Sequence, residues 1–135
     1  MNSKRPALHI WAVALTALMT YRLLPLVSYG DLGDSVPISW VNPFTGDILI
    51  GLTAPIMAFL LARRQTLFVW TVAIVWHALG IWDYCTGIIL DFVDPITWAP
   101  PGALELLVAG VLIQLLNVYI LTRPRMIQAY IGNRR

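Results

Sequence analysis

The chain has 135 residues, enough for one domain, and 59% of them are hydrophobic while only 12% are charged. A soluble globular domain carries about twice that share of charged residues, so the composition indicates a membrane protein. The net charge of +2 is small and no basic residues alternate with aromatic ones, which argues against a nucleic-acid-binding function.

The charged residues are clustered and leave four long uncharged intervals along the chain. Each interval, with a few flanking residues, reaches the roughly 20 residues that a helix needs to cross the hydrocarbon core. Because only helices satisfy their own backbone hydrogen bonds in lipid, we expect an all-α fold, an integral membrane four-helix bundle. Residues 1–135 then form one membrane domain, with spans at about 8–27, 44–62, 66–90 and 103–122 and a basic tail at 123–135.

The first predicted span follows Lys4 and Arg5, a pattern that also occurs in signal peptides. Its apolar run is longer than a typical signal core, and Met19-Thr20-Tyr21-Arg22 stands where a cleavage site needs small residues. We therefore interpret this segment as an uncleaved span. In the second span, small residues recur every four positions, which favours internal packing over a homodimer face.

Eight of the nine basic residues fall on one side of the predicted spans, and Arg22 is the exception. Loops rich in Lys and Arg stay in the cytoplasm, so we expect both termini there. The longer loops, about 28–43 and 91–102, then face outward. These two loops contain the acidic residues Asp31, Asp34, Asp91 and Asp94.

Ionisable residues inside a span are costly and mark candidate sites. The third span contains His77, Asp83 and Tyr84 within Trp76-His77-Ala78-Leu79-Gly80-Ile81-Trp82-Asp83-Tyr84. A rise of about 1.5 Å per residue places His77 near the midplane and brings one arginine and three carboxylates to one outer level. The candidates for ligand binding or ion pairing are therefore Arg22, Asp47, His77, Asp83, Tyr84 and Glu105.

Each candidate also has a structural interpretation without a function. Arg22 and Asp83 could form a simple buried ion pair, and Arg22 could also extend to the headgroups. Asp47 and Glu105 stand in first helical turns, where the helix dipole favours an acid. A single His77 in an apolar span is often a hydrogen-bonded packing residue.

Cofactors and metals receive no support from the sequence. Cys85 is the only cysteine, so the chain can form neither an intramolecular disulfide nor a cysteine metal cluster. His9 and His77 lie at different depths, which argues against a haem held by both. Zinc bound by His77, Asp83 and Asp47 is disfavoured because residues six apart on a helix point in nearly opposite directions. We infer no catalytic residues, and the cofactor remains open.

Two segments, Gly46–Pro55 and Trp76–Asp83, carry the patterns G-D-x3-G-x2-A-P and W-x3-G-x2-D. They resemble paired motifs in small bacterial four-span membrane proteins of unassigned function. His77 stands where those motifs have asparagine. The resemblance implies a bacterial inner-membrane protein and places Asp47 and Asp83 inside the matching motifs, but it implies no activity.

Three classes of function therefore remain open. The preferred one is a non-enzymatic accessory subunit or small-ligand-binding protein with an outward-facing polar pocket. The second is a proton- or cation-coupled transporter that uses Asp47 and Asp83 as titrating carboxylates. The third is a membrane enzyme that acts on a lipid or other apolar substrate with Asp83 and His77. The expected partners are the lipid bilayer and either a larger membrane complex or further copies of the chain.

Overall fold

All regular elements in the described part of the chain are helices, as the sequence predicts. The structure is a computed structural model and describes residues 7–24, 37–95 and 102–131. Two of its elements, η1 and η3, are 3-10 helices. In chain order the elements are α1 (Ala7–Leu18), η1 (Met19–Leu23), η3 (Ile38–Trp40), α3 (Val41–Arg63), α4 (Leu67–Val93), α5 (Ala103–Leu121) and α6 (Pro124–Ile131).

Three helical segments are long and apolar enough to cross a membrane, Ile38–Arg63, Leu67–Val93 and Ala103–Leu121. They match the second, third and fourth predicted spans and extend two of them by a few residues. At the start of α4, Thr66 caps the helix, because its Oγ1 atom accepts a hydrogen bond from the backbone N–H of Val69 at 3.3 Å. The prediction of transmembrane helices is confirmed by length and composition.

The first predicted span is shorter in the part that the structure describes. α1 and η1 form one apolar helix, Ala7–Leu23, and residues 25–27 of the prediction lie outside the described ranges. In the 3-10 winding of η1, side chains three positions apart point in the same direction. Met19 and Arg22 are therefore both buried. This local winding, which periodicity did not predict, directs Arg22 into the protein.

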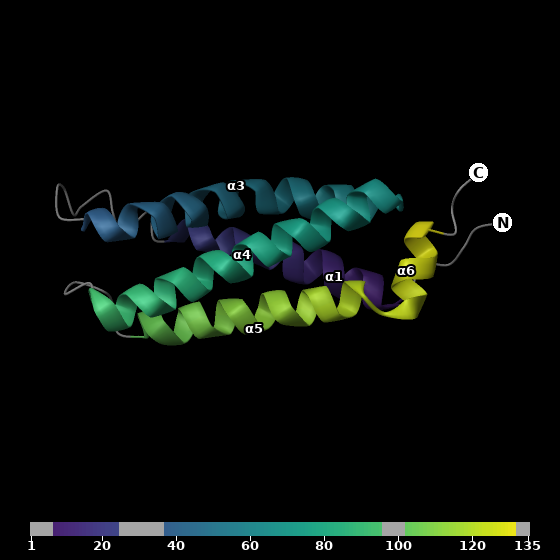
Figure 1. Cartoon of the computed structure of the whole chain (residues 1–135). Coiled ribbons are helices and arrows are strands. Elements are labelled where there is room, and N and C mark those ends of the chain that lie inside the picture. Colours follow the sequence, from purple (N-terminus) through teal and green to yellow (C-terminus); the bar gives the residue numbers. More distant parts are fainter. Residues whose placement is uncertain (1–6, 25–36, 96–101, 132–135) are drawn as a thin grey trace.

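The long helices lie side by side (Figure 1). α4 lies between α3 and α5 in this view, with α1 behind them, and successive helices run in opposite directions. α1 packs against α3 and α5, and α4 packs against the same two helices. We refer to α1 with η1, α3, α4 and α5 as the bundle. α6 turns across the end of the bundle at which α1 begins.

Polar side chains lie inside the bundle, whereas large apolar side chains cover its outside. Trp11, Phe59, Trp82 and Leu112 are among the exposed apolar residues, and they come from all four helices. This distribution is the reverse of that in a soluble protein and suits a lipid environment. The buried polar residues are His9, Thr16, Arg22, His77, Gln114 and Asn117.

The repeated small residues also face inward. Ala54 and Ala58 of α3 are buried, as are Ala12 and Thr16 of α1. Small side chains let helix backbones approach closely in lipid, and α1 and α3 pack against each other here. The small-residue pattern therefore serves packing within the chain.

Candidate functional site

Arg22 lies at the centre of a charged cluster between η1, α3 and α4. It is only 1% exposed, and its Nη1 atom donates to Asp83 Oδ2 at 3.0 Å. The same Nη1 atom is 3.5 Å from Asp47 Oδ1, and Nη2 donates to the backbone carbonyl of Gly80 at 2.9 Å. The structure thus contains the expected ion pair between Arg22 and Asp83. We refer to Arg22, Asp47 and Asp83 as the charged cluster.

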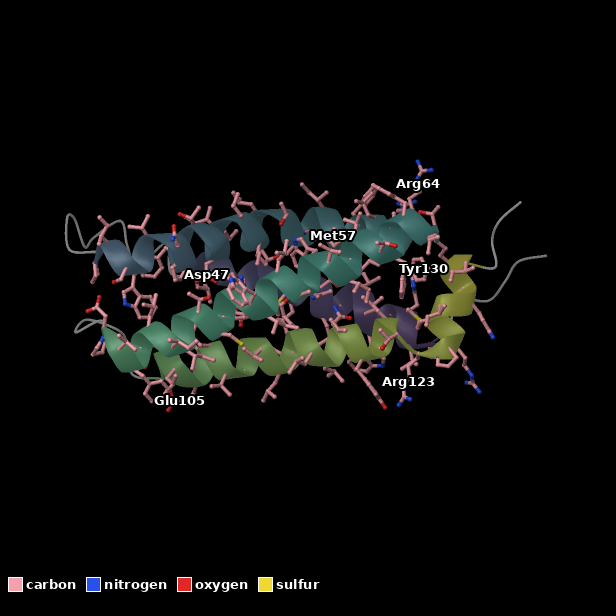
Figure 2. The ribbon with its side chains drawn as sticks, in the orientation of Figure 1. Asp47, Met57, Arg64, Glu105, Arg123 and Tyr130 are labelled. Carbon is pink, nitrogen blue, oxygen red and sulfur yellow. The ribbon has the colours of Figure 1, made fainter. Side chains whose placement is uncertain are left out.

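Gly46 lets α3 approach the cluster closely. A Cβ atom at this position would collide with the carboxylate of Asp83, so only glycine leaves room for the two helices at this spacing. Asp47 is the next residue, and the close approach brings its carboxylate within reach of Arg22. Figure 2 shows Asp47 where α3 borders α4. The space beside Gly46 is therefore filled by the carboxylate of Asp83.

An aromatic pair supports the buried guanidinium. The Cζ atom of Arg22 lies 3.5 Å from the centroid of the Tyr84 ring, a cation–π contact that partly replaces the lost hydration. The Tyr84 hydroxyl donates to the hydroxyl of Tyr21. On α5, Gly110 leaves room for both rings, because a Cβ there would collide with Tyr84 and lie 2.6 Å from the Tyr21 hydroxyl.

The charged cluster contains more negative than positive groups. Two carboxylates face one guanidinium, so full ionisation would leave one negative charge in a region of low dielectric constant. The side chains of Asp47 and Asp83 are 16% and 17% exposed, whereas that of Arg22 is fully buried. A positive ion that approaches from outside therefore meets the carboxylates first. The arrangement suits a proton or a small cation and disfavours an anion.

A second group of polar residues lies deeper in the bundle. His77 Nε2 is 2.8 Å from Asn117 Nδ2, and His77 Nδ1 is 3.1 Å from Gln114 Oε1. Asn117 Nδ2 also donates to Thr16 Oγ1 at 2.8 Å. These contacts join α1, α4 and α5. We refer to Thr16, His77, Gln114 and Asn117 as the polar core.

Uncharged partners surround both ring nitrogens of His77. Asn117 Nδ2 has two hydrogens and lies near three acceptors, the Ala12 carbonyl at 3.2 Å, Thr16 Oγ1 at 2.8 Å and His77 Nε2 at 2.8 Å. On the other side of the ring, Nδ1 faces Gln114 Oε1 at 3.1 Å. His77 is therefore held between uncharged side chains, as a packing residue would be.

Gly80 links the two groups. Its carbonyl accepts from Arg22, and a Cβ on it would collide with the side chain of Gln114. At the far end of the bundle, the Tyr130 hydroxyl is 3.3 Å from His9 Nδ1. Buried polar side chains therefore occur at three levels of the bundle interior.

The structure separates the six predicted site residues into three sets. His77 belongs to the polar core, and its ring nitrogens contact Thr16, Gln114 and Asn117 rather than the charged cluster. Glu105 joins neither group, as described below. The residues that the structure brings together are Arg22, Asp47, Asp83 and Tyr84.

The expectation that Glu105 lies with the other outer carboxylates is wrong. Glu105 is exposed in the first turn of α5, and within the described ranges the ion pairs of carboxylates are those of Asp47 and Asp83. Figure 2 shows Glu105 on the outer side of α5. The rise per residue predicts depth along a helix but not the direction in which a side chain points around it. Its position in a first turn suits the helix dipole instead.

The six predicted candidates do not include Tyr21, Thr16, Gln114 and Asn117, four residues that the structure places in the two groups. Gln114 carried a usable signal, because it stands three positions before Asn117 in an otherwise apolar span. Residues at this spacing share a helix face, and polar residues in a span face other helices. For Tyr21 no such signal exists, since its position depends on the 3-10 winding of η1.

Among the residues that the structure describes, no group of three or more His, Cys, Asp or Glu side chains is placed to hold a metal ion. A scan of family models and searches of curated proteins and solved structures found no match to this chain.

Proposed function

We propose that the chain is a four-span protein of the bacterial inner membrane with both termini in the cytoplasm. Three membrane-length helices and the shorter apolar helix Ala7–Leu23 support the number of spans. The arginines between α3 and α4 and after α5 support the orientation. The likeness of Gly46–Pro55 and Trp76–Asp83 to motifs of small bacterial membrane proteins supports the location.

The function that the geometry supports best is non-enzymatic binding of a proton or a small monovalent cation. The observation that carries this proposal is the excess of one carboxylate over the guanidinium in the charged cluster. An isolated negative charge in a region of low dielectric constant is costly, so a proton or cation that neutralises it is stabilised. Asp47 is the principal ligand, because Asp83 already accepts a direct hydrogen bond from Arg22.

Cation-coupled transport is a second candidate, and the polar core favours it. The polar residues Gln114, His77 and Asn117 continue the buried polar interior beyond the charged cluster. A purely structural ion pair does not require such a continuation. Proton or sodium flux into proteoliposomes would distinguish transport from binding alone.

An enzymatic role receives no support from the geometry. The ring nitrogens of His77 contact Gln114, Asn117 and Thr16, whereas the carboxylate of Asp83 contacts Arg22. The two side chains therefore do not form an acid–base pair around a shared substrate position. Association with a larger membrane complex or with further copies remains a prediction, which co-purification in a mild detergent tests.

The experiment compares three matched amide variants in lipid nanodiscs, Asp47→Asn, Asp83→Asn and Glu105→Gln. Each replaces one carboxylate by a nearly isosteric amide. Potentiometric titration would count the protons that the protein binds, and sodium chloride titration against choline chloride would measure stabilisation by Na⁺. We expect Asp47→Asn to abolish the Na⁺ response or to remove one titrating proton of the cluster. Glu105→Gln should keep the Na⁺ response and lose only the proton of an exposed carboxyl.

The proposal would be contradicted by one combination of results for Asp47→Asn. The variant would be folded, its Na⁺ response would be unchanged, and its proton titration curve would match that of Glu105→Gln. The carboxylates would then serve the ion pair with Arg22 alone. Asp83→Asn serves as a second measurement, because it also weakens the contact with Arg22 and should lower stability as well as binding.

A further inference from the structure

Four exposed arginines mark the end of the bundle opposite the charged cluster. We refer to Arg63, Arg64, Arg123 and Arg125 as the arginine end. Figure 2 shows Arg64 and Arg123 at this end, on opposite sides of the bundle, and Asp47 and Glu105 toward the other end. In the described ranges, the arginine that forms ion pairs is Arg22. The four exposed guanidinium groups are therefore available to an external anion.

The acidic residues of the helices lie far from the arginine end. Asp47 on α3 and Asp83 on α4 are each roughly 24 Å along their helix from that end, from the rise per residue. Glu105 lies at the opposite end of α5 from Arg123. At that distance the carboxylates are beyond a Debye length and offset little of the positive potential.

Two of the arginines lie over exposed aromatic rings. The Cζ atom of Arg123 is 4.0 Å from the centroid of Tyr119, and that of Arg63 is 5.7 Å from the centroid of Phe59. These rings are 52% and 58% exposed on the apolar outside of the bundle. Each guanidinium is thus held where the apolar surface meets the polar end. A phospholipid bound here would place its phosphate at the guanidinium and its acyl chains along the ring.

The orientation of α6 adds a third observation. Met126 and Tyr130 are buried against the bundle, while Arg125 is exposed. α6 therefore lies across the bundle end, as an interfacial helix does (Figure 1). Arg125 is in the first turn of α6, where the helix dipole disfavours a cation. Helix-dipole stabilisation, which would explain Arg63 at the end of α3, does not explain Arg125.

We infer that the arginine end is a binding site for acidic phospholipid headgroups of the surrounding bilayer. The ligand class is a phosphate diester with a net negative charge, of which phosphatidylglycerol is the simplest member. The inference rests on the proposed insertion of the bundle in a membrane. It is independent of cation binding at Asp47 and Asp83.

The test uses the full chain in a mild nonionic detergent and two lipids with identical acyl chains, phosphatidylglycerol and phosphatidylcholine. Native mass spectrometry would count retained lipids, and the unfolding midpoint would report stabilisation. A basic residue near an anionic surface contributes about fivefold in apparent affinity, so we expect the variant R63Q/R64Q/R123Q/R125Q, which removes four of them, to bind phosphatidylglycerol about 600-fold more weakly. The control D91N/D94N/E105Q, which removes three acids away from the arginine end, should bind as the wild type does.

Equal binding of the two lipids by the wild type would overturn the inference, and so would undiminished phosphatidylglycerol binding by the fourfold glutamine variant. Glycerol 3-phosphate, which carries the phosphate without acyl chains, should give no stabilisation at the same concentration. A stabilisation equal to that by the lipid would show an anion site without lipid specificity and would also overturn it. The Na⁺ response of the fourfold variant should stay unchanged, so failure here leaves the cation proposal intact.

Discussion

The carboxylate of Asp83 on α4 occupies the space that a side chain at Gly46 of α3 would need. α3 and α4 therefore approach each other closely at the level where Arg22 enters from η1. The ion pair and the close helix contact depend on the same glycine. A change at Gly46 thus acts on charge and packing together.

Replacement of Gly46 by alanine should displace the Asp83 carboxylate and weaken its contact with Arg22. Overpacking of this kind costs about 1–3 kcal/mol. We expect a lower unfolding midpoint in detergent. Gly87→Ala is a matched control on α4, because a Cβ there would lie at an ordinary 3.5 Å from Leu107. If both substitutions lower the unfolding midpoint equally, the loss of stability comes from replacing a helix glycine and not from displacing Asp83.

Arg22 and Asp83 should be energetically coupled. Arg22→Leu leaves two carboxylates without their partner, and removal of one member of a buried pair costs about 3–5 kcal/mol. Asp83→Leu should cost less than Arg22→Leu, because Asp47 remains 3.5 Å from the guanidinium. The double variant should recover part of the summed loss in unfolding free energy. Additive single effects would argue that the pair is not coupled in the membrane protein.

The polar core should stabilise the packing of α4 against α1 and α5. His77→Leu leaves Gln114 Oε1 without a partner, at a cost of about 1–3 kcal/mol, whereas Asn117 Nδ2 keeps Thr16 and the Ala12 carbonyl. The unfolding midpoint should fall accordingly. Thr86→Val provides a control on the same helix, since the Thr86 hydroxyl donates only to the carbonyl of Trp82. If the unfolding midpoint of His77→Leu falls no further than that of this control, the polar core does not stabilise the packing of α4.

The proposed orientation makes a prediction for reporter fusions. Fusions after Arg64 and Arg135 should report the cytoplasm, and fusions near Gly33 and Pro95 should report the outside, because loops rich in arginine are retained. Alkaline phosphatase and green fluorescent protein fusions give opposite readouts for each position. An external report at Arg64 would be incompatible with four spans in this orientation.

The sequence was sufficient to predict the helical class and the three long membrane-length segments. Hydrocarbon thickness determines how many residues a span needs, and the uncharged intervals between ionisable residues meet that length. The sequence also predicted the start of α4 near Thr66 and the inward position of the small residues of α3, because both depend on residues close together in the chain. The position along each helix also followed from the sequence, which is why Arg22 and Asp83 were predicted at one level of the bundle.

Only the tertiary structure decided which side chains at that level meet. The position along the helices predicted that Glu105 lies at the level of Asp47 and Asp83. In the structure, however, α5 directs Glu105 outward and Gln114 inward. The rotation of a helix about its axis depends on the packing of all its neighbours, here on contacts at Gly46, Gly80 and Gly110. These contacts join residues far apart in the chain, and a 3-10 turn at η1 redirects Tyr21 and Arg22. The sequence alone therefore predicts the helices and their polar residues, whereas packing selects the ones that form the site.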